Sequence, residues 1–130
     1  MNDYSRYLKI PWKDKGRDFS GCDCWGWARL FANYECGLAI KDISYSSCKN
    51  VHELQRIAGI EQQKWCTIDL SDVRKGDFVD LSREGRDYHI GVMVTDKLIG
   101  HLEVNAFPVL VNKNSFKIRN RIKGVWRYVG

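Results

Sequence analysis

The sequence predicts an α+β fold in which N-terminal helices pack on a C-terminal antiparallel β-sheet. In the first third, Trp27, Leu30, Phe31 and Tyr34 recur at helical spacing. After Lys75 the pattern changes to short β-rich runs that are separated by turn residues. Helices followed by strands, rather than an alternation of the two, are typical of α+β domains. A chain of 130 residues without repeats or linkers predicts one domain over residues 1–130.

The helical part contains three predicted helices. A short one covers Tyr4–Ile10, because Pro11 disfavours helical angles at the residue before it. The polar stretch Lys13–Ser20 is predicted as a loop. Ser20 and Asp23 then resemble a capping box for the long helix, which a C-cap glycine at position 37 ends.

A third helix and six strands complete the predicted fold. Asn50 with Glu53 repeats the capping pattern and predicts a short helix over residues 51–58, ended by a glycine. The predicted strands are Phe78–Leu81, Tyr88–Val94, Leu98–Val104, Val109–Val111, Phe116–Ile118 and Val125–Val129.

Composition narrows the classes of partner. The 21 Lys and Arg residues against 16 Asp and Glu give a net charge of +5, which favours anionic partners. No arginine-rich run or nucleic-acid module accompanies this charge, so we expect no nucleic-acid partner. No run approaches 18 apolar residues, and residues 1–6 lack the apolar core of a signal peptide. We therefore expect no membrane span, and synthesis in a cytosol.

The five cysteines do not suggest a disulfide scaffold or a metal site. Their odd number cannot be fully paired within one chain, and Cys22-Asp23-Cys24 lacks the spacing of zinc ligands. Cys36, Cys48 and Cys66 are interpreted as small apolar residues. For Cys22 a buried bystander and a strained local disulfide on oxidation both stay open.

Cys24 lies at the predicted start of the long helix. The first N–H groups of a helix have no intrahelical partner, and the macrodipole is positive there. Both effects favour a thiolate, and such placement can lower the pKa of a cysteine from about 8.5 to roughly 3.5–7.5. The sequence therefore predicts Cys24 as a nucleophile, with an inert core cysteine as the alternative.

A cysteine nucleophile needs a base, and the chain has three histidines. His52 is predicted on a solvent-facing side of the third helix. His89 shares one face of its strand with Gly91, and Ile90, Val92 and Val94 form the core face. His101 falls in the next strand, where it can lie beside His89. A cross-strand pair without function is the alternative, but the presence of Cys24 favours catalysis.

These motifs together resemble the NlpC/P60 cysteine peptidases, which have a trimmed papain-like fold. The resemblance rests on Asp23-Cys24-Trp25-Gly26, on Gly76-Asp77-Phe78-Val79 and on His89-Ile90-Gly91-Val92-Met93-Val94. Ile10-Pro11-Trp12 and Gly16-Arg17-Asp18 are similar to the branch found in phage tail proteins. The resemblance covers most of residues 7 to 104.

Carried over to this chain, the resemblance implies Cys24 as nucleophile, His89 as general base and His101 as the third catalytic residue, with Glu103 in reserve. It places Tyr7 or Trp12 near the nucleophile. Arg17 and Asp18 are possible cleft residues, although a solvated loop explains them equally well. Trp25 is either a cleft wall or part of the core.

The implied activity is hydrolysis of peptidoglycan stem peptides, commonly at the D-glutamyl–diaminopimelate bond, without a metal or organic cofactor. The implied setting is a virion tail, with other phage tail proteins as partners. A non-catalytic tail-tip subunit is one alternative. An antibacterial effector amidase or an acyltransferase on the same scaffold is the other.

Overall fold

The computed structural model describes residues 4–42, 64–81 and 89–130. Its helices are α1 (Ser5–Leu8), α2 (Cys24–Cys36), the 3₁₀ helix η2 (Leu70–Asp72) and α4 (Phe116–Arg119). The predicted helix over residues 51–58, His52 and Cys48 lie outside the described residues. Among the helices of the described part, none is long and apolar enough to cross a membrane.

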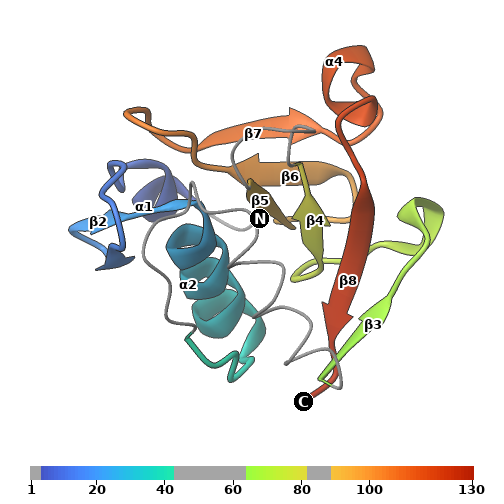
Figure 1. Ribbon diagram of the computed structural model, residues 1–130, viewed down its shortest axis with the longest axis horizontal. Helices are drawn as coiled ribbons and strands as arrows, with labels where there is room; N and C mark the ends of the chain where they lie inside the picture. Colours follow the sequence, from blue (N-terminus) through green and yellow to red (C-terminus); the bar gives the residue numbers. More distant parts are fainter. Residues whose placement is uncertain (1–3, 43–63, 82–88) are drawn as a thin grey trace.

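Six strands form one antiparallel sheet in the order β3-β8-β4-β5-β6-β7 (Figure 1). They are β3 (Trp65–Thr67), β4 (Phe78–Asp80), β5 (Ile90–Met93), β6 (Leu98–His101), β7 (Val109–Asn112) and β8 (Gly124–Tyr128). A separate two-stranded sheet pairs β1 (Arg17–Asp18) with β2 (Gly21–Cys22) just before α2. The predicted α+β class is confirmed.

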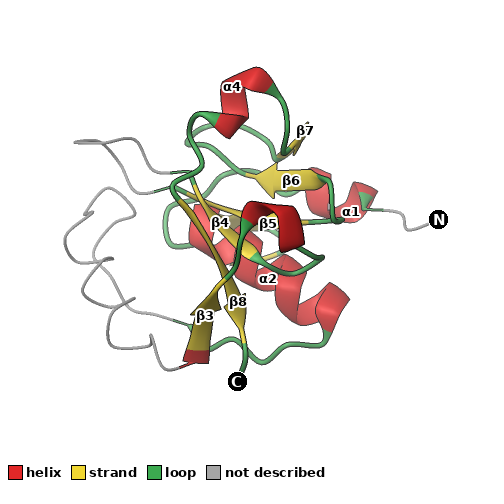
Figure 2. Cartoon of the chain, turned by 90° about the vertical axis from the view of Figure 1, so that its right-hand side faces the viewer, coloured by secondary structure: helices red, strands yellow, loops and turns green. Residues whose placement is uncertain are grey.

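Alternating side chains bury both faces of the sheet. Ile90, Val92 and Leu102 belong to a cluster that contains most of the apolar side of α2. Met93 and Ile99, which alternate with them, belong to a second cluster with residues of β4, β8 and α4. The first cluster fixes α2 against β5 and β6 (Figures 1 and 2).

The long helix begins three residues later than a cap at Ser20 would place it. Asp23 is the N-cap, and its carboxylate accepts a hydrogen bond from the backbone N–H of Gly26 at 2.7 Å. Ser20 instead donates its hydroxyl to Asp18 in the turn between β1 and β2. Gly37 ends the helix in the left-handed conformation, with φ 64°, as predicted.

Three other sequence interpretations need correction. The run Phe116–Ile118 is not a strand but most of α4, in which Phe116 is exposed and Ile118 is buried. A short apolar run cannot be assigned by periodicity alone, which explains this error. The predicted loop Lys13–Ser20 contains β1. Strand β3 was missed, because three residues give no measurable alternation.

Candidate active site

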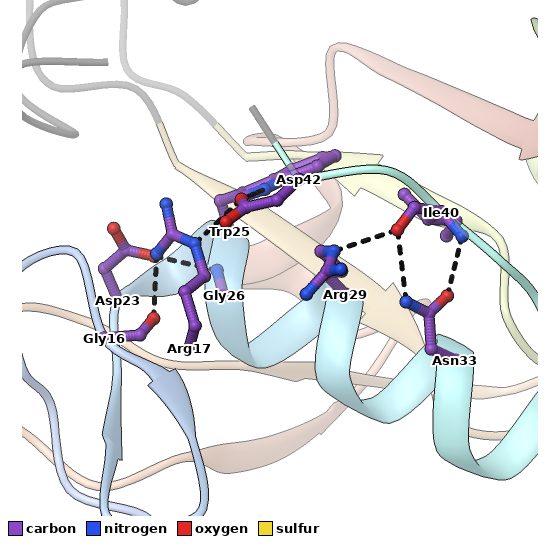
Figure 3. Close-up of polar contacts among 9 residues, drawn as sticks. All are labelled: Gly16, Arg17, Asp23, Trp25, Gly26, Arg29, Asn33, Ile40 and Asp42. Carbon is purple, nitrogen blue, oxygen red and sulfur yellow. Dashed lines mark hydrogen bonds and ion pairs between the residues drawn. The ribbon is translucent and has the colours of Figure 1, made fainter. Parts of the chain in front are cut away.

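Cys24 is the first residue of α2 and only 3% exposed. The adjacent Asp23 is fully buried. Its negative charge would repel a thiolate on Cys24. Arg17 compensates, because its Nη1 lies 2.9 Å from Oδ1 of Asp23 (Figure 3). The start of the helix thus combines a capping carboxylate with a neighbouring guanidinium.

Arg17 ties three segments together at this point. Its Nη1 also donates to the carbonyl of Gly16 at 2.8 Å, and its Nε donates to Asp42 at 2.9 Å. Trp25 donates its indole N–H to the same Asp42 carboxylate at 3.3 Å. Figure 3 shows these contacts clustered over the first turn of α2. Arg17, expected at the cleft or in a solvated loop, is a structural link.

The glycine of the Asp-Cys-Trp-Gly motif permits this arrangement. A Cβ on Gly26 would lie 2.2 Å from the backbone oxygen of Gly16, which no side chain allows. Because Gly26 has no side chain, the segment before β1 can pack on the first helical turn.

The segment after α2 returns along the helix to this network. Asn33 exchanges two hydrogen bonds with the backbone of Ile40, and Arg29 donates to the same carbonyl at 2.9 Å (Figure 3). These bonds hold residues 40–42 beside α2. They bring Asp42 back to Arg17 and Trp25.

The two histidines meet at one end of the sheet. His89 directly precedes β5, and His101 is the last residue of β6, opposite Gly91. Nε2 of His89 lies 2.9 Å from Nδ1 of His101, and the residues are 9% and 5% exposed. The predicted side-by-side placement of the histidines is therefore observed.

Charged groups border this histidine couple. Oε1 of Glu103 lies 3.9 Å from Nε2 of His89 and 3.1 Å from Nη1 of Arg121. Burial lowers the pKa of His101; the Glu103 carboxylate opposes this and the Arg121 guanidinium adds to it. A neutral His101 can accept a hydrogen bond at Nδ1 from Nε2–H of His89. That tautomer leaves Nδ1 of His89 to act as a base.

The start of α2 lies at the same end of the sheet as the couple. Trp12 forms a bridge with Cys22 and donates its backbone N–H to Ala106 at 3.2 Å. Ala106 in turn donates to the carbonyl of Glu103. The strand leading into Cys24 is thereby joined to the loop that follows His101.

The other expected cleft residues have different positions. Trp12 is half-buried between these two segments and therefore borders the site. Trp25 is buried, with its ring 5.5 Å from that of Phe78, as the core interpretation predicts. Asp18 is exposed and accepts hydrogen bonds from Ser20.

The hydroxyl of Tyr7 lies toward the other end of α2 from Cys24. It is fully buried, and its hydroxyl donates to Glu35 at 2.6 Å, near the opposite end of α2. Eleven residues of helix correspond to about 16 Å. Burial, with the hydrogen bond to Glu35, raises the pKa of Tyr7 to about 12.

Cys22 is a buried bystander. Its Sγ donates to the carbonyl of Asp18 at 3.2 Å, and it forms no disulfide. Burial raises its pKa to about 12, with the Asp23 carboxylate adding to the effect. Such a thiol is not ionised at neutral pH, so Cys22 is not suited to act as a nucleophile.

Sequence reasoning missed Asp23 as the cap and Arg121 as a neighbour of the couple. Asp23 had a signal, since aspartate is a preferred N-cap and directly precedes Cys24. Arg121 had none, because it lies 18 residues from Glu103 and only the fold brings them together.

The couple also has the donors of a metal site. Ligand atoms of His89, His101 and Glu103 lie within 4.8 Å of one another. Two imidazoles and a carboxylate suit zinc. In this structure the imidazoles are hydrogen-bonded to each other and Glu103 is paired with Arg121, which satisfies these groups without a cation.

Comparison with solved structures identifies the fold. The chain is similar to the NlpC/P60 domain of the peptidoglycan hydrolase SagA, with a TM-score of 0.61 and 17% identity over 93% of this chain and 89% of that one. It is also similar to a lipoprotein-like protein of the NLP/P60 family from Staphylococcus aureus subsp. aureus Mu50. That match has a TM-score of 0.59 and 15% identity over 97% of this chain and 40% of the other.

The chain therefore has the NlpC/P60 fold, a small papain-like α+β architecture. No family model matches the sequence, and no curated protein matches it. The similarity lies in the arrangement of the helices and strands, not in the amino-acid sequence.

Proposed function

We propose that this protein is a cysteine peptidase that cleaves stem peptides of peptidoglycan. The main support is the buried His89–His101 couple, which lies at the end of the sheet where α2 begins with Cys24. The NlpC/P60 fold, shared with a domain of a peptidoglycan hydrolase, supports the substrate class.

In the proposed reaction, the Cys24 thiolate attacks the carbonyl carbon of the scissile amide. The backbone N–H of Cys24 donates to the resulting oxyanion. Protonated His89 then gives its proton to the leaving amine, and an acyl-enzyme remains on Cys24. His89 next takes a proton from water, whose attack releases the carboxylic acid and restores the thiolate. His101 accepts from His89 throughout and fixes its orientation.

The finer assignment is a D-glutamyl–diaminopimelate endopeptidase in a phage tail, made in the host cytoplasm and assembled with other tail proteins. Its support is the sequence resemblance, in Ile10-Pro11-Trp12 and Gly16-Arg17-Asp18, to the tail-associated branch. In that setting the enzyme opens the cell wall locally during infection. The net charge of +5 suits an anionic wall.

A non-catalytic tail-tip subunit is the second candidate. The observation in its favour is the burial of Cys24 and of both histidines, which limits access to substrate. Thiol reactivity separates the two candidates. An activated Cys24 reacts with iodoacetamide near pH 6, whereas a thiol that serves only packing does not.

The decisive experiment is digestion of purified peptidoglycan with mass spectrometry of the released fragments. Wild type is compared with Cys24→Ala and with the matched control Cys22→Ala. We expect stem-peptide fragments from wild type and from Cys22→Ala, and none from Cys24→Ala. Fragment masses identify the bond. Equal release by Cys24→Ala would remove the nucleophile assignment, and no release by any protein together with an inert Cys24 would favour the structural subunit.

A further inference from the structure

The net positive charge of this chain lies in its C-terminal part. All 16 Asp and Glu residues lie in residues 1–103, together with 15 of the 21 Lys and Arg residues. Residues 104–130 carry the other six cations and no acid. The formal charges of the two parts are therefore −1 and +6. Such segregation points to an anionic partner at the C-terminal part rather than to a diffuse charge.

Half of these six cations are used inside the fold. Lys113 donates to the carbonyl of Leu70 at 3.1 Å, Arg121 binds Glu103, and Arg127 lies 2.8 Å from Asp77. These three groups are committed to structure. They are not available to a partner without a cost in stability.

The other three, Lys117, Arg119 and Lys123, form the basic surface. All are exposed, and none pairs with a carboxylate within the described ranges. Because a helix turns by about 100° per residue, Lys117 and Arg119 flank Ile118 on either side. Ile118 is buried in the second core cluster, so the basic surface is anchored to the sheet.

Two further observations concern the kind of ligand that this surface could bind and its position relative to the histidine couple. Phe116, next to Lys117, is 83% exposed, which offers an apolar face to sugar rings. Arg121 connects the segment to Glu103 and hence to the histidine couple. Figure 1 shows α4 at the β7 end of the sheet, away from α1 and from the end of α2.

We infer that Lys117, Arg119 and Lys123 dock an anionic phosphodiester polymer of the cell wall beside the active site. The choice of a wall polymer rests on the proposed function. The charge complementarity does not, because repeating phosphates suit a group of exposed cations that pair with no carboxylate among the described residues. Docking there would hold the enzyme on its substrate while Cys24 acts on a stem peptide.

The test measures binding without cleavage. Proteins with Cys24→Ala are sedimented with purified walls that carry phosphodiester polymers or have been stripped of them by hydrofluoric acid. The triple variant K117Q/R119Q/K123Q is compared with K9Q/K15Q/K41Q, which removes the same charge from exposed positions elsewhere. Circular dichroism checks that both variants fold.

We expect the parent protein and the control triple to bind polymer-bearing walls, and the surface triple to lose this binding. Three phosphate contacts imply about a 20-fold loss of affinity between 50 and 200 mM salt, using the slope per contact of flexible single strands. The surface triple should lack this salt dependence.

Three results would overturn the inference. They are equal binding by the two triples, equal binding of the parent to stripped walls, and tighter binding of the parent to duplex DNA than to polymer-bearing walls. Digestion of stripped peptidoglycan by proteins that retain Cys24 tests the proposed peptidase separately, because that substrate carries no phosphodiester.

Discussion

The two ends of the candidate site are held in place by different interactions. At the start of α2, the buried Asp23 is both the helix cap and the partner of Arg17, so its charge is matched within 2.9 Å. At the end of the sheet, His89 and His101 are buried against each other, and the neighbouring charged groups, Glu103 and Arg121, are partly exposed.

Because of this difference, substitutions at the two ends of the site should have different effects. The Asp23–Arg17 pair joins the cap of α2 to strand β1, so changes at this end of the site should act on folding. Imidazoles titrate near neutral pH, so changes at the histidine end should act on activity and on pH dependence. Each prediction below tests one side of this contrast.

The largest effect is expected at His89, the proposed general base. His89→Gln should lower kcat/KM for stem-peptide release by about 10²–10⁴-fold, because the side chain no longer accepts a proton. Its far-UV circular dichroism should match that of wild type. His52→Gln, at a position predicted to face solvent, is the control and should retain activity. Loss of activity in the control alone would exchange the roles of the two residues.

The next effect is on stability at the helix end. Arg17→Ala leaves the buried Asp23 carboxylate without its guanidinium partner. We expect a loss of about 2 kcal/mol in the free energy of unfolding, below the usual cost of breaking a buried pair because Arg17 is partly exposed. Urea denaturation measures it.

The control for that change is Arg6→Ala, which removes an exposed cation from Glu35 at 3.2 Å. An exposed pair contributes little to stability, so we expect a smaller loss than in Arg17→Ala. If both variants lose the same stability, the Asp23–Arg17 pair has no special role and the contrast between the two ends fails.

At the histidine end the expected effect depends on pH. Burial lowers the pKa of His101 in the folded protein below its value in the unfolded chain. The unfolded chain therefore binds more protons as pH falls through about 6.5, and the folded protein loses stability there. We expect His101→Gln to reduce this loss between pH 7.5 and 5.5 in thermal melts. An unchanged pH dependence would mean that another group is responsible.

The sequence allowed prediction of those features that depend on local chemistry. The Gly37 cap, the core face of Ile90, Val92 and Val94, and the placement of Cys24 at a helix start all follow from near neighbours. Features that depend on distant segments were missed. Strand β3 is defined by pairing with β8, more than 50 residues away. Arg121 is separated from Glu103 in the sequence by β7 and α4.

The smallest predicted effect is a change in the pKa of His101 at the histidine end of the site. The guanidinium of Arg121 contributes to the lowered pKa of His101. Arg121→Gln removes that charge and also releases Glu103, whose carboxylate favours the protonated imidazole. Both changes should raise the pKa of His101, which NMR titration of the imidazole Cε1 protons can follow. Lys123→Gln removes an equal charge from an exposed position and should leave the titration unchanged. A shift of equal size in Lys123→Gln would show that the net charge of the segment, rather than the Glu103–Arg121 contact, sets the titration of the couple.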